Sequence, residues 1–188
     1  IIQEIAAGGS FLNGITHKNN QLFITDFTAK KIYTYRIQEN EFNTFVSGLV
    51  KTPNGIVYDS INDRLVMVNW GADAPINAIS LVDSTVIELT ATDLNNCDGI
   101  AMDCDGNFYV ASWSPQRISV FDNMFATEPL TADITGLSNA ADIYYNALFD
   151  TLAIPSSGND KVVMAYFESC IEVDTPVAIS EIQSTTNM

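Results

Sequence analysis

The sequence predicts an all-β protein, a β-propeller of which about four four-stranded blades are present, as part of a six-bladed ring. Three observations support this fold. An Asn/Asp-Gly-Ile motif recurs at Asn13, Asn54 and Asp98, at intervals of 41 and 44 residues. A polar residue closes the second predicted strand of every repeat, with spacings of 43, 43 and 44 residues, at Asp26, Asn69, Ser112 and Ser156. Alternating β-branched and aromatic residues favour strands, and four strands per ~40–45 residues are typical of a propeller blade.

The elements follow the same order in each repeat. A first strand carries the motif, a polar turn follows, and a second strand ends in the polar residue. The aligned segments are LNGITHKNNQLFITDF, PNGIVYDSINDRLVMVNW, CDGIAMDCDGNFYVASW and AADIYYNALFDTLAIPSS. The predicted third strands are KIYTYRI, NAISLVD, QRISVFD and KVVMAYF. Fourth strands complete only three repeats, as NTFVSGL, VIELTATDL and PLTADITGL.

These repeats divide the chain into a propeller, residues 1–169, and a polar tail, residues 170–188, which is interpreted as a linker. The blades are expected to start near residues 11, 52, 96 and 139, and residues 1–10 read as the last strand of a preceding blade. That strand could pair with the fourth repeat and close a four-bladed ring. Alternatively, further blades precede Ile1 in a six-bladed ring, and this is the interpretation we favour because the chain starts within a blade and without Met.

The charge balance excludes one class of partner. Only 8 Lys and Arg residues stand against 23 Asp and Glu residues, for a net charge of −15. Nucleic-acid binding depends on cationic side chains that neutralise phosphates, so we expect no nucleic-acid partner. No apolar run approaches the ~20 residues needed to span a bilayer, so no membrane span is predicted.

The three cysteines are Cys97, Cys104 and Cys170. Cys97 and Cys104 flank one predicted strand, which would hold them about 20 Å apart. A disulfide requires Cα atoms within ~7 Å, and the spacing does not resemble a zinc site. We therefore expect three free or structural cysteines.

The repeat resembles the gluconolactonase and regucalcin (senescence marker protein) superfamily of six-bladed propellers, related to NHL-repeat arrays, over roughly residues 1–169. The segments FLNG, TPNGIVYD, DGNFYVASWSP and DTLAIPSSGN are most similar to secreted, uncharacterised proteins of marine Bacteroidota. Such proteins carry a C-terminal type IX secretion sorting domain after a short linker. The resemblance thus implies a secreted or cell-surface protein.

The resemblance also implies one divalent metal in the central channel. Asn54 matches a ligand Asn of the family, Asp98 matches a ligand Asp, and Asn13 matches an additional Asn. The family's Glu ligand has no counterpart here, because it would belong to a blade before Ile1. In the fourth repeat the ligand position holds Ala141, and Asp142 replaces the glycine.

The residues themselves support the same site. The first strand of every blade lines the channel of a propeller, so Asn13, Asn54 and Asp98 should converge near its axis. Hard cations accept carboxylate and amide oxygens, and Ca²⁺ is the expected metal. A second interpretation remains open: Asn-Gly and Asp-Gly are common turn dipeptides, because they tolerate positive φ, and the polar residue could serve the loop alone.

Two functions follow from this site. The favoured hypothesis is a non-catalytic binding or interaction module that takes a small-molecule or protein ligand at the channel mouth. The alternative is a metal-dependent lactonase or esterase, in which the metal polarises a carbonyl group and Asp98 activates water as the catalytic base.

Other conspicuous residues are assigned structural roles. His17 lacks a matching catalytic motif and is interpreted as structural. Asp59, Asp103 and Asp105 lie in predicted turns and should stabilise them. Trp70 and Trp113 occupy equivalent positions and are expected to pack between blades rather than to line a ligand rim.

Overall fold

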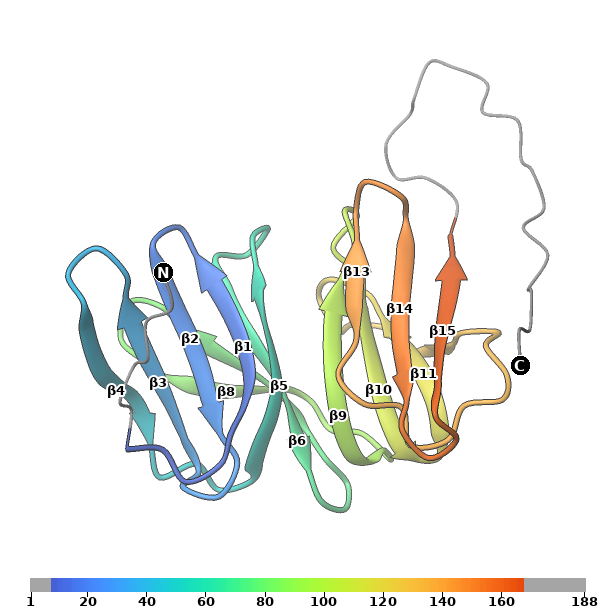
Figure 1. Cartoon of the computed structure of the whole chain (residues 1–188), viewed down its shortest axis with the longest axis horizontal. Helices are drawn as coiled ribbons and strands as arrows, with labels where there is room; N and C mark the ends of the chain where they lie inside the picture. The colour runs from blue at the N-terminus through green and yellow to red at the C-terminus, as the bar shows by residue number, and fades with distance from the viewer. Residues whose placement is uncertain (1–7, 168–188) are drawn as a thin grey trace.

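The computed structural model describes residues 8–167, which form four antiparallel sheets arranged as a β-propeller (Figure 1). The predicted fold class is confirmed. Blade 1 contains β1 (Leu12–Lys18), β2 (Gln21–Asp26), β3 (Lys31–Arg36) and β4 (Glu41–Ser47). Blade 2 contains β5 (Thr52–Asp59), β6 (Arg64–Trp70), β7 (Ile76–Ser80) and β8 (Val86–Thr90). Blade 3 contains β9 (Asn95–Met102), β10 (Phe108–Ser114), β11 (Gln116–Phe121) and β12 (Leu130–Thr131). Blade 4 contains β13 (Tyr144–Asn146), β14 (Thr151–Ser156) and β15 (Lys161–Tyr166).

Strands that follow one another in the chain are neighbours in every sheet. The first strand of each sheet is the innermost, and β1 contacts β5, β5 contacts β9, and β9 contacts β13. Residues from these four strands line a central cavity of ≈ 390 Å³. Within residues 8–167 no helix is long and apolar enough to cross a membrane.

The hydrophobic core lies between the blades rather than within one layer. Side chains alternate between the two faces of each strand, so each blade presents one apolar face to the blade before it and one to the blade after it. Three clusters result, one at each interface. They include Phe23 and Leu65 between blades 1 and 2, Val66 and Phe108 between blades 2 and 3, and Tyr109 and Leu152 between blades 3 and 4.

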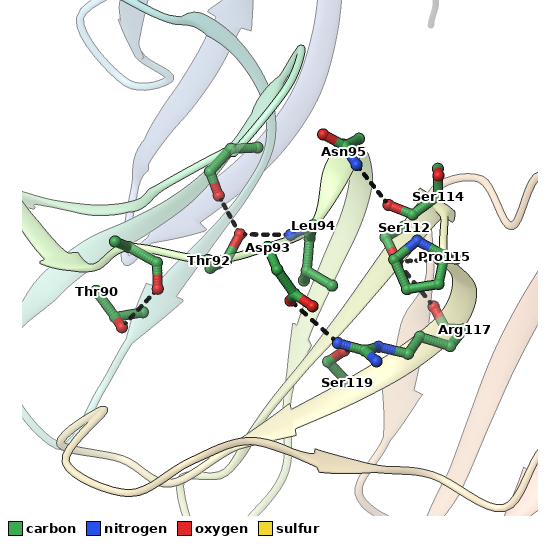
Figure 2. Close-up of polar contacts among 12 residues, drawn as sticks. Thr90, Thr92, Asp93, Leu94, Asn95, Ser112, Ser114, Pro115, Arg117 and Ser119 are labelled. Atoms are coloured by element: carbon green, nitrogen blue, oxygen red, sulfur yellow. Dashed lines mark hydrogen bonds and ion pairs between the residues drawn. The ribbon is translucent and has the colours of Figure 1, made fainter.

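The polar residue that closes each second strand is fully buried in all four blades. The Asp26 carboxylate accepts hydrogen bonds from the backbone N–H groups of Ser10 (2.7 Å), Phe11 (3.2 Å) and Ala29 (2.8 Å). In blade 3 the Ser112 hydroxyl donates to the carbonyl of Pro115 at 2.6 Å (Figure 2). The 43- to 44-residue spacing therefore marks one buried position that satisfies loop backbone in each blade.

Side chains also organise the entry to blade 3, as Figure 2 shows. The Thr92 hydroxyl donates to the carbonyl of Ala74 at 2.7 Å and accepts from the N–H of Leu94 at 3.1 Å. The Arg117 guanidinium lies 3.3 Å from the Asp93 carboxylate. These contacts tie the β8–β9 connection to both of the blades that it joins.

The outer strand of blade 3 is shorter than the sequence suggested, with only Leu130–Thr131 in β12. The strand starts one residue after the predicted start at Pro129 but ends early: the N–H of Ala132 still donates to the carbonyl of Ile118 at 2.9 Å, and the N–H of Ile134 donates to the carbonyl of Ala132 at 2.8 Å. The Asp122 carboxylate accepts hydrogen bonds from the backbone N–H groups of Met124, Ala126 and Thr127 and from the Thr127 hydroxyl, which closes a compact turn. This turn precedes the strand and leaves its start near the predicted position.

Two predicted turn-forming aspartates have that role. Asp59 accepts from the N–H groups of Ile61 and Asn62 and forms a buried ion pair with Arg64 at 2.8 Å. Asp103 accepts from the N–H groups of Asp105 (3.0 Å) and Asn107 (2.7 Å). Their carboxylates are thus occupied by their own turns.

The cysteine expectation is wrong at one position. Cys104 is disulfide-bonded, whereas Cys97 is buried and free. The length of the predicted strand between Cys97 and Cys104 excludes only a bond between these two residues. Cys170, the predicted linker at 170–188 and most of the strand predicted for residues 1–10 lie outside the described residues.

The glycine of the repeated motif is required by close approach between blades, not by a turn conformation. Gly14, Gly55 and Gly99 lie in the inner strands and none has a positive φ. A Cβ atom would lie 2.6 Å from the carbonyl oxygen of Asn54 at Gly14, and 2.5 Å from that of Asp98 at Gly55. At Gly99 it would lie 2.5 Å from the backbone nitrogen of Ile143. Each inner strand therefore packs backbone against backbone on the next.

We predict that Gly55→Ala lowers the free energy of unfolding by about 1–3 kcal/mol, because the new methyl group must displace the backbone of blade 3. Urea denaturation measures this loss. Asn43→Ala is the control, since Asn43 is exposed in the outer strand β4 and lies at no contact between inner strands. A Gly55→Ala protein as stable as the wild type would contradict the close approach.

We predict that Asp26→Asn lowers the free energy of unfolding at pH 7 by about 3 kcal/mol, because a buried amide replaces an acceptor of several N–H groups. Burial alone would raise the pKa of Asp26, but these backbone hydrogen bonds outweigh it and lower the pKa. The contribution of Asp26 is therefore complete above the ordinary aspartate pKa of about 4 and is lost as the pH falls through the lower folded-state value.

Urea denaturation at several pH values from 7 down to 2 tests this dependence. The difference between wild type and Asp26→Asn should shrink as the pH falls. The difference between the wild type and Asn43→Ala, an exposed position with no ionisable group, should not change with pH. A difference that stays constant with pH would argue against an ionised Asp26.

Candidate functional site

The structure brings the three sequence-predicted residues together at one end of the channel. The side-chain amide of Asn13 donates a hydrogen bond to Oδ1 of Asn54. Nδ2 of Asn54 in turn donates to Oδ1 of Asp98 and to the carbonyl of Cys97, both at 3.0 Å. The three side chains thus form a hydrogen-bonded row across blades 1, 2 and 3, which we call the polar row.

A β-bulge in each inner strand positions these side chains. The pairing register shifts between Leu12 and Ile15 in β1, and between Pro53 and Ile56 in β5. The β9–β10 pairing shifts at the same point, opposite the Val110–Ser112 segment. A bulge interrupts the ladder and redirects a side chain, so the motif residue can point away from the sheet.

Blade 1 shows how the freed backbone is satisfied. The N–H of Gly14 donates to the Thr25 hydroxyl at 2.8 Å, and this hydroxyl donates to the carbonyl of Asn54 at 2.7 Å. One buried threonine therefore closes the bulge of β1 and links blade 1 to blade 2.

The carboxyl of Asp98 has an unusual environment for a group near a surface. Burial raises its pKa, hydrogen bonding from Asn54 and Trp113 lowers it, and the nearby charge of Asp142 raises it, with a net upward shift. Partial loss of hydration also raises the pKa of Asp142. The site therefore holds two carboxyl groups that ionise less readily than an ordinary aspartate.

Asp142 is the functional candidate that the ligand pattern from the sequence did not include. It follows Ala141, whose position matches Asn13, Asn54 and Asp98, and it occupies the glycine position of the motif. The Cβ that Gly99 lacks would lie 2.8 Å from Cα of Asp142, so the two inner strands touch here. The signal in the sequence was the replacement of glycine by an acidic residue.

A row of aromatic side chains borders the same end of the channel. Ring centroids are 5.4 Å apart for Phe11 and Phe27, 5.9 Å for Phe27 and Trp70, and 4.8 Å for Trp70 and Trp113. The Trp113 indole N–H donates to the carbonyl of Ala140 in blade 4 at 3.1 Å. Both tryptophans pack between blades as predicted. They remain only partly buried, so this aromatic row also forms part of the rim.

The polar row offers some of the oxygen ligands that a hard cation prefers. Asp98, Asn54 and Asn13 offer one carboxylate and two amide oxygens, and Asp142 adds a second carboxylate nearby. Among residues 8–167 no group of three or more His, Cys, Asp or Glu side chains is placed to hold a metal. Asn54 presents its amide nitrogen to Asp98, so a cation would have to replace the hydrogen bonds of the row. The residue types fit Ca²⁺, with few charges to bind it.

His17 lies in β1 and lines the central cavity, together with Asp142 and Tyr144. It is exposed, as expected for a channel-facing residue of an inner strand. Its assignment as structural remains a prediction.

Comparison with solved structures supports the β-propeller fold. The chain is similar to a chain of the nidogen/laminin complex, with 19% identity and a TM-score of 0.74 over 82% of this chain and 60% of the other. It is similar to a gluconolactonase from Xanthomonas campestris, with 14% identity and a TM-score of 0.72 over 86% of this chain and 60% of the other. An auxiliary nutrient binding protein from Bacteroides thetaiotaomicron matches with 16% identity and a TM-score of 0.70, over 86% and 39%.

The chain thus spans 60% or less of the length of these proteins, and identities below 20% indicate a common fold. No family model matches the sequence, and no curated protein matches it. Function must therefore be argued from the site.

We predict that Asp98→Asn makes the protein more stable than the wild type at pH 7. The folded-state pKa of Asp98 is raised, so its contribution to stability is complete below the ordinary aspartate pKa and is lost as the pH rises through the folded-state value. The amide removes that loss while keeping an oxygen for Asn54.

Urea denaturation at pH 3 and pH 7 checks this sign. The two proteins should be alike at pH 3 and differ at pH 7. Asp63→Asn is the opposite control, because hydrogen bonding from Lys18 lowers the pKa of Asp63 and its neutralisation should weaken the fold at pH 7. Equal stability of Asp98→Asn and wild type at pH 7 would argue against a raised pKa of Asp98 in the folded protein.

Proposed function

We propose that this chain is a non-catalytic binding module of a secreted or cell-surface protein, which takes its ligand at the channel mouth. One observation carries the proposal: the polar row and the aromatic row lie at the same rim and together cross blades 1 to 3. Aromatic rings supply contact area, and amide and carboxyl groups supply directional hydrogen bonds, which is the usual composition of a binding site.

The ligand is a small organic molecule or a protein segment that carries hydrogen-bonding groups. A ligand donor or acceptor can exchange for the mutual hydrogen bonds of Asn13, Asn54 and Asp98 without leaving a polar group unpaired. Two similar structures support a binding role by their descriptions, one as part of the nidogen/laminin complex and one as an auxiliary nutrient binding protein.

A divalent cation, with Ca²⁺ as the best candidate, is part of the proposal. Asp98, Asn54 and Asn13 would hold it, with Asp142 as a further carboxylate. A cation would also favour the ionised forms of Asp98 and Asp142, whose pKa values are raised. With so few charges the affinity should fall in the weak range of about 10⁻⁴–10⁻³ M found in extracellular modules.

Location outside the cytoplasm is supported by the disulfide at Cys104, because disulfides persist mainly in oxidising compartments. The proposal includes the type IX secretion route that the resemblance implies. The chain has 23 acidic residues and only 8 basic ones, and this negative net charge agrees with a soluble exported domain.

The second candidate function is a metal-dependent lactonase or esterase. The likeness to a gluconolactonase favours it. A raised pKa also suits Asp98 as the catalytic base, since a base works best when its pKa lies closer to the working pH. A bound cation would polarise the substrate carbonyl, and Asp98 would accept the proton from the attacking water.

Titration calorimetry with Ca²⁺, Mg²⁺ and Zn²⁺ tests the cation site, and a panel of lactones tests hydrolysis. The chain contains only two tryptophans, Trp70 and Trp113, and both lie at this rim, so their fluorescence gives a local readout. We expect Ca²⁺ binding that changes this fluorescence, is lost in Asp98→Ala and is retained in the control Asp105→Ala.

The outcomes separate the two functions. Cation binding without lactone turnover supports the binding module. Turnover that Asp98→Ala abolishes and Asp105→Ala preserves would replace it with the hydrolase. Wild-type protein that binds none of the three cations would remove the cation from the proposal.

A further inference from the structure

Asn69, which closes the second strand of blade 2, holds a buried oxygen atom without a hydrogen-bond partner. The residue is fully buried, and its Nδ2 donates to the carbonyl of Pro75 at 2.7 Å and to Oδ1 of Asn77 at 2.6 Å. Within residues 8–167 nothing donates to Oδ1 of Asn69. Because a buried acceptor without a donor destabilises a fold, this atom needs a donor.

The equivalent residues of the other blades use their side-chain oxygens. Both carboxylate oxygens of Asp26 accept hydrogen bonds from backbone N–H groups. The hydroxyl of Ser112 donates to the carbonyl of Pro115 at 2.6 Å, and the hydroxyl of Ser156 accepts from the N–H of Ser138 at 2.7 Å. Blade 2 therefore departs from the repeat at this position.

Asn69 lines a pocket of ≈ 400 Å³ between blades 1 and 2, which we call the interblade pocket. In blade 2, Met67 pairs with Asn77 and Asn77 pairs with Glu88, so these side chains share the face that packs on blade 1. The apolar walls are completed by Val46, Leu49, Val50, Pro75 and Val86. A mainly apolar lining with a few polar groups is typical of small-molecule sites.

Two charged side chains of opposite sign line the interblade pocket, Lys51 and Glu88. Both are exposed, and neither takes part in an ion pair within the described residues. The Lys51 ammonium group donates to the carbonyl of Ala72 at 3.3 Å. Because the charges of one cation and one anion balance, the pocket favours an uncharged ligand over an acid or an amine.

We propose that the interblade pocket binds a small uncharged molecule that has an apolar ring or chain and a hydroxyl group. The hydroxyl group donates to Oδ1 of Asn69 and supplies the missing partner, and the ring or chain lies against the apolar walls. None of the pocket residues belongs to the polar row or to the aromatic row, so this site is separate from the channel mouth.

Access to Oδ1 of Asn69 requires a small movement, because the atom is buried. The neighbouring Asn77 provides this movement: its side chain is half-buried, and its Nδ2 donates a long hydrogen bond of 3.4 Å to the carbonyl of Ile87. When Asn77 turns aside, a ligand hydroxyl replaces it by accepting from Nδ2 of Asn69 and donating to Oδ1. The amide of Asn69 then has a partner for each of its polar atoms.

Two probes of nearly equal shape test this proposal. Cyclohexanol has a hydroxyl donor, whereas cyclohexanone only accepts hydrogen bonds, and the saturated ring of both suits an apolar wall. Binding to the full-length protein is measured by NMR of ¹³C-methyl methionine, in which Met67 reports from the pocket and the exposed Met124 is the internal control. The Met67→Leu variant identifies the pocket signal.

Asn69→Ser is the matched variant, because serine occupies the equivalent position in blades 3 and 4, and Ser112 donates to a proline carbonyl as Asn69 does. In the wild type we expect cyclohexanol to shift the Met67 signal saturably and to bind roughly tenfold more tightly than cyclohexanone, since only cyclohexanol donates to Oδ1. In Asn69→Ser this preference should be lost. If the variant does not fold, the comparison of the two probes in the wild type decides the proposal alone.

Equal affinities of the wild type for cyclohexanol and cyclohexanone would contradict a donor at Asn69. A Met67 signal that neither probe shifts would mean that the interblade pocket holds water only, and would overturn the proposal. Tighter binding of the cyclohexylammonium ion than of cyclohexanol would overturn the uncharged class of ligand. An equal preference in the wild type and in Asn69→Ser would remove Asn69 as the acceptor.

Discussion

The backbone-to-backbone approach of neighbouring inner strands is the constraint on which the rest of this structure depends. At Gly14, Gly55 and Gly99 a single methyl group would collide with the next strand. This approach sets the distance between blades, and that distance decides which side chains fill the space between them. The aliphatic and aromatic clusters of the three interfaces are packed to that spacing, and the hydrophobic effect across them supplies the main stabilisation. Blade 4 is informative because Asp142 occupies the glycine position there, where no described strand follows.

The same approach builds the candidate site. The bulges beside the glycines turn Asn13, Asn54 and Asp98 toward a common line, where neighbouring strands are close enough for direct hydrogen bonds between side chains. The arrangement disfavours the ionised form of Asp98, whose pKa is raised. A perturbed carboxyl pKa of this kind is common at functional sites. The aromatic row reinforces the rim, since Trp70 and Trp113 both join blades and border the site.

The fold of this protein does not by itself identify its function. The similar structures include a chain of a protein complex, an enzyme and a nutrient binding protein, so the propeller alone does not choose among these activities. The polar groups at the rim, in contrast, are specific to this chain and are satisfied by one another.

The sequence by itself determined the repeat, the all-β fold, the strand order and the three residues of the polar row. Period-2 alternation and a 43- to 44-residue spacing can both be read along the chain without knowledge of its folded contacts. It also indicated the turn roles of Asp59 and Asp103. Only the tertiary structure decided why glycine recurs, since positive φ and close approach predict the same residue and differ only in what lies opposite. The disulfide at Cys104 and the nearness of Asp142 to Asp98 likewise depend on contacts between distant segments. Such contacts leave no periodic signal in the chain, and they are set by the packing of one blade on the next.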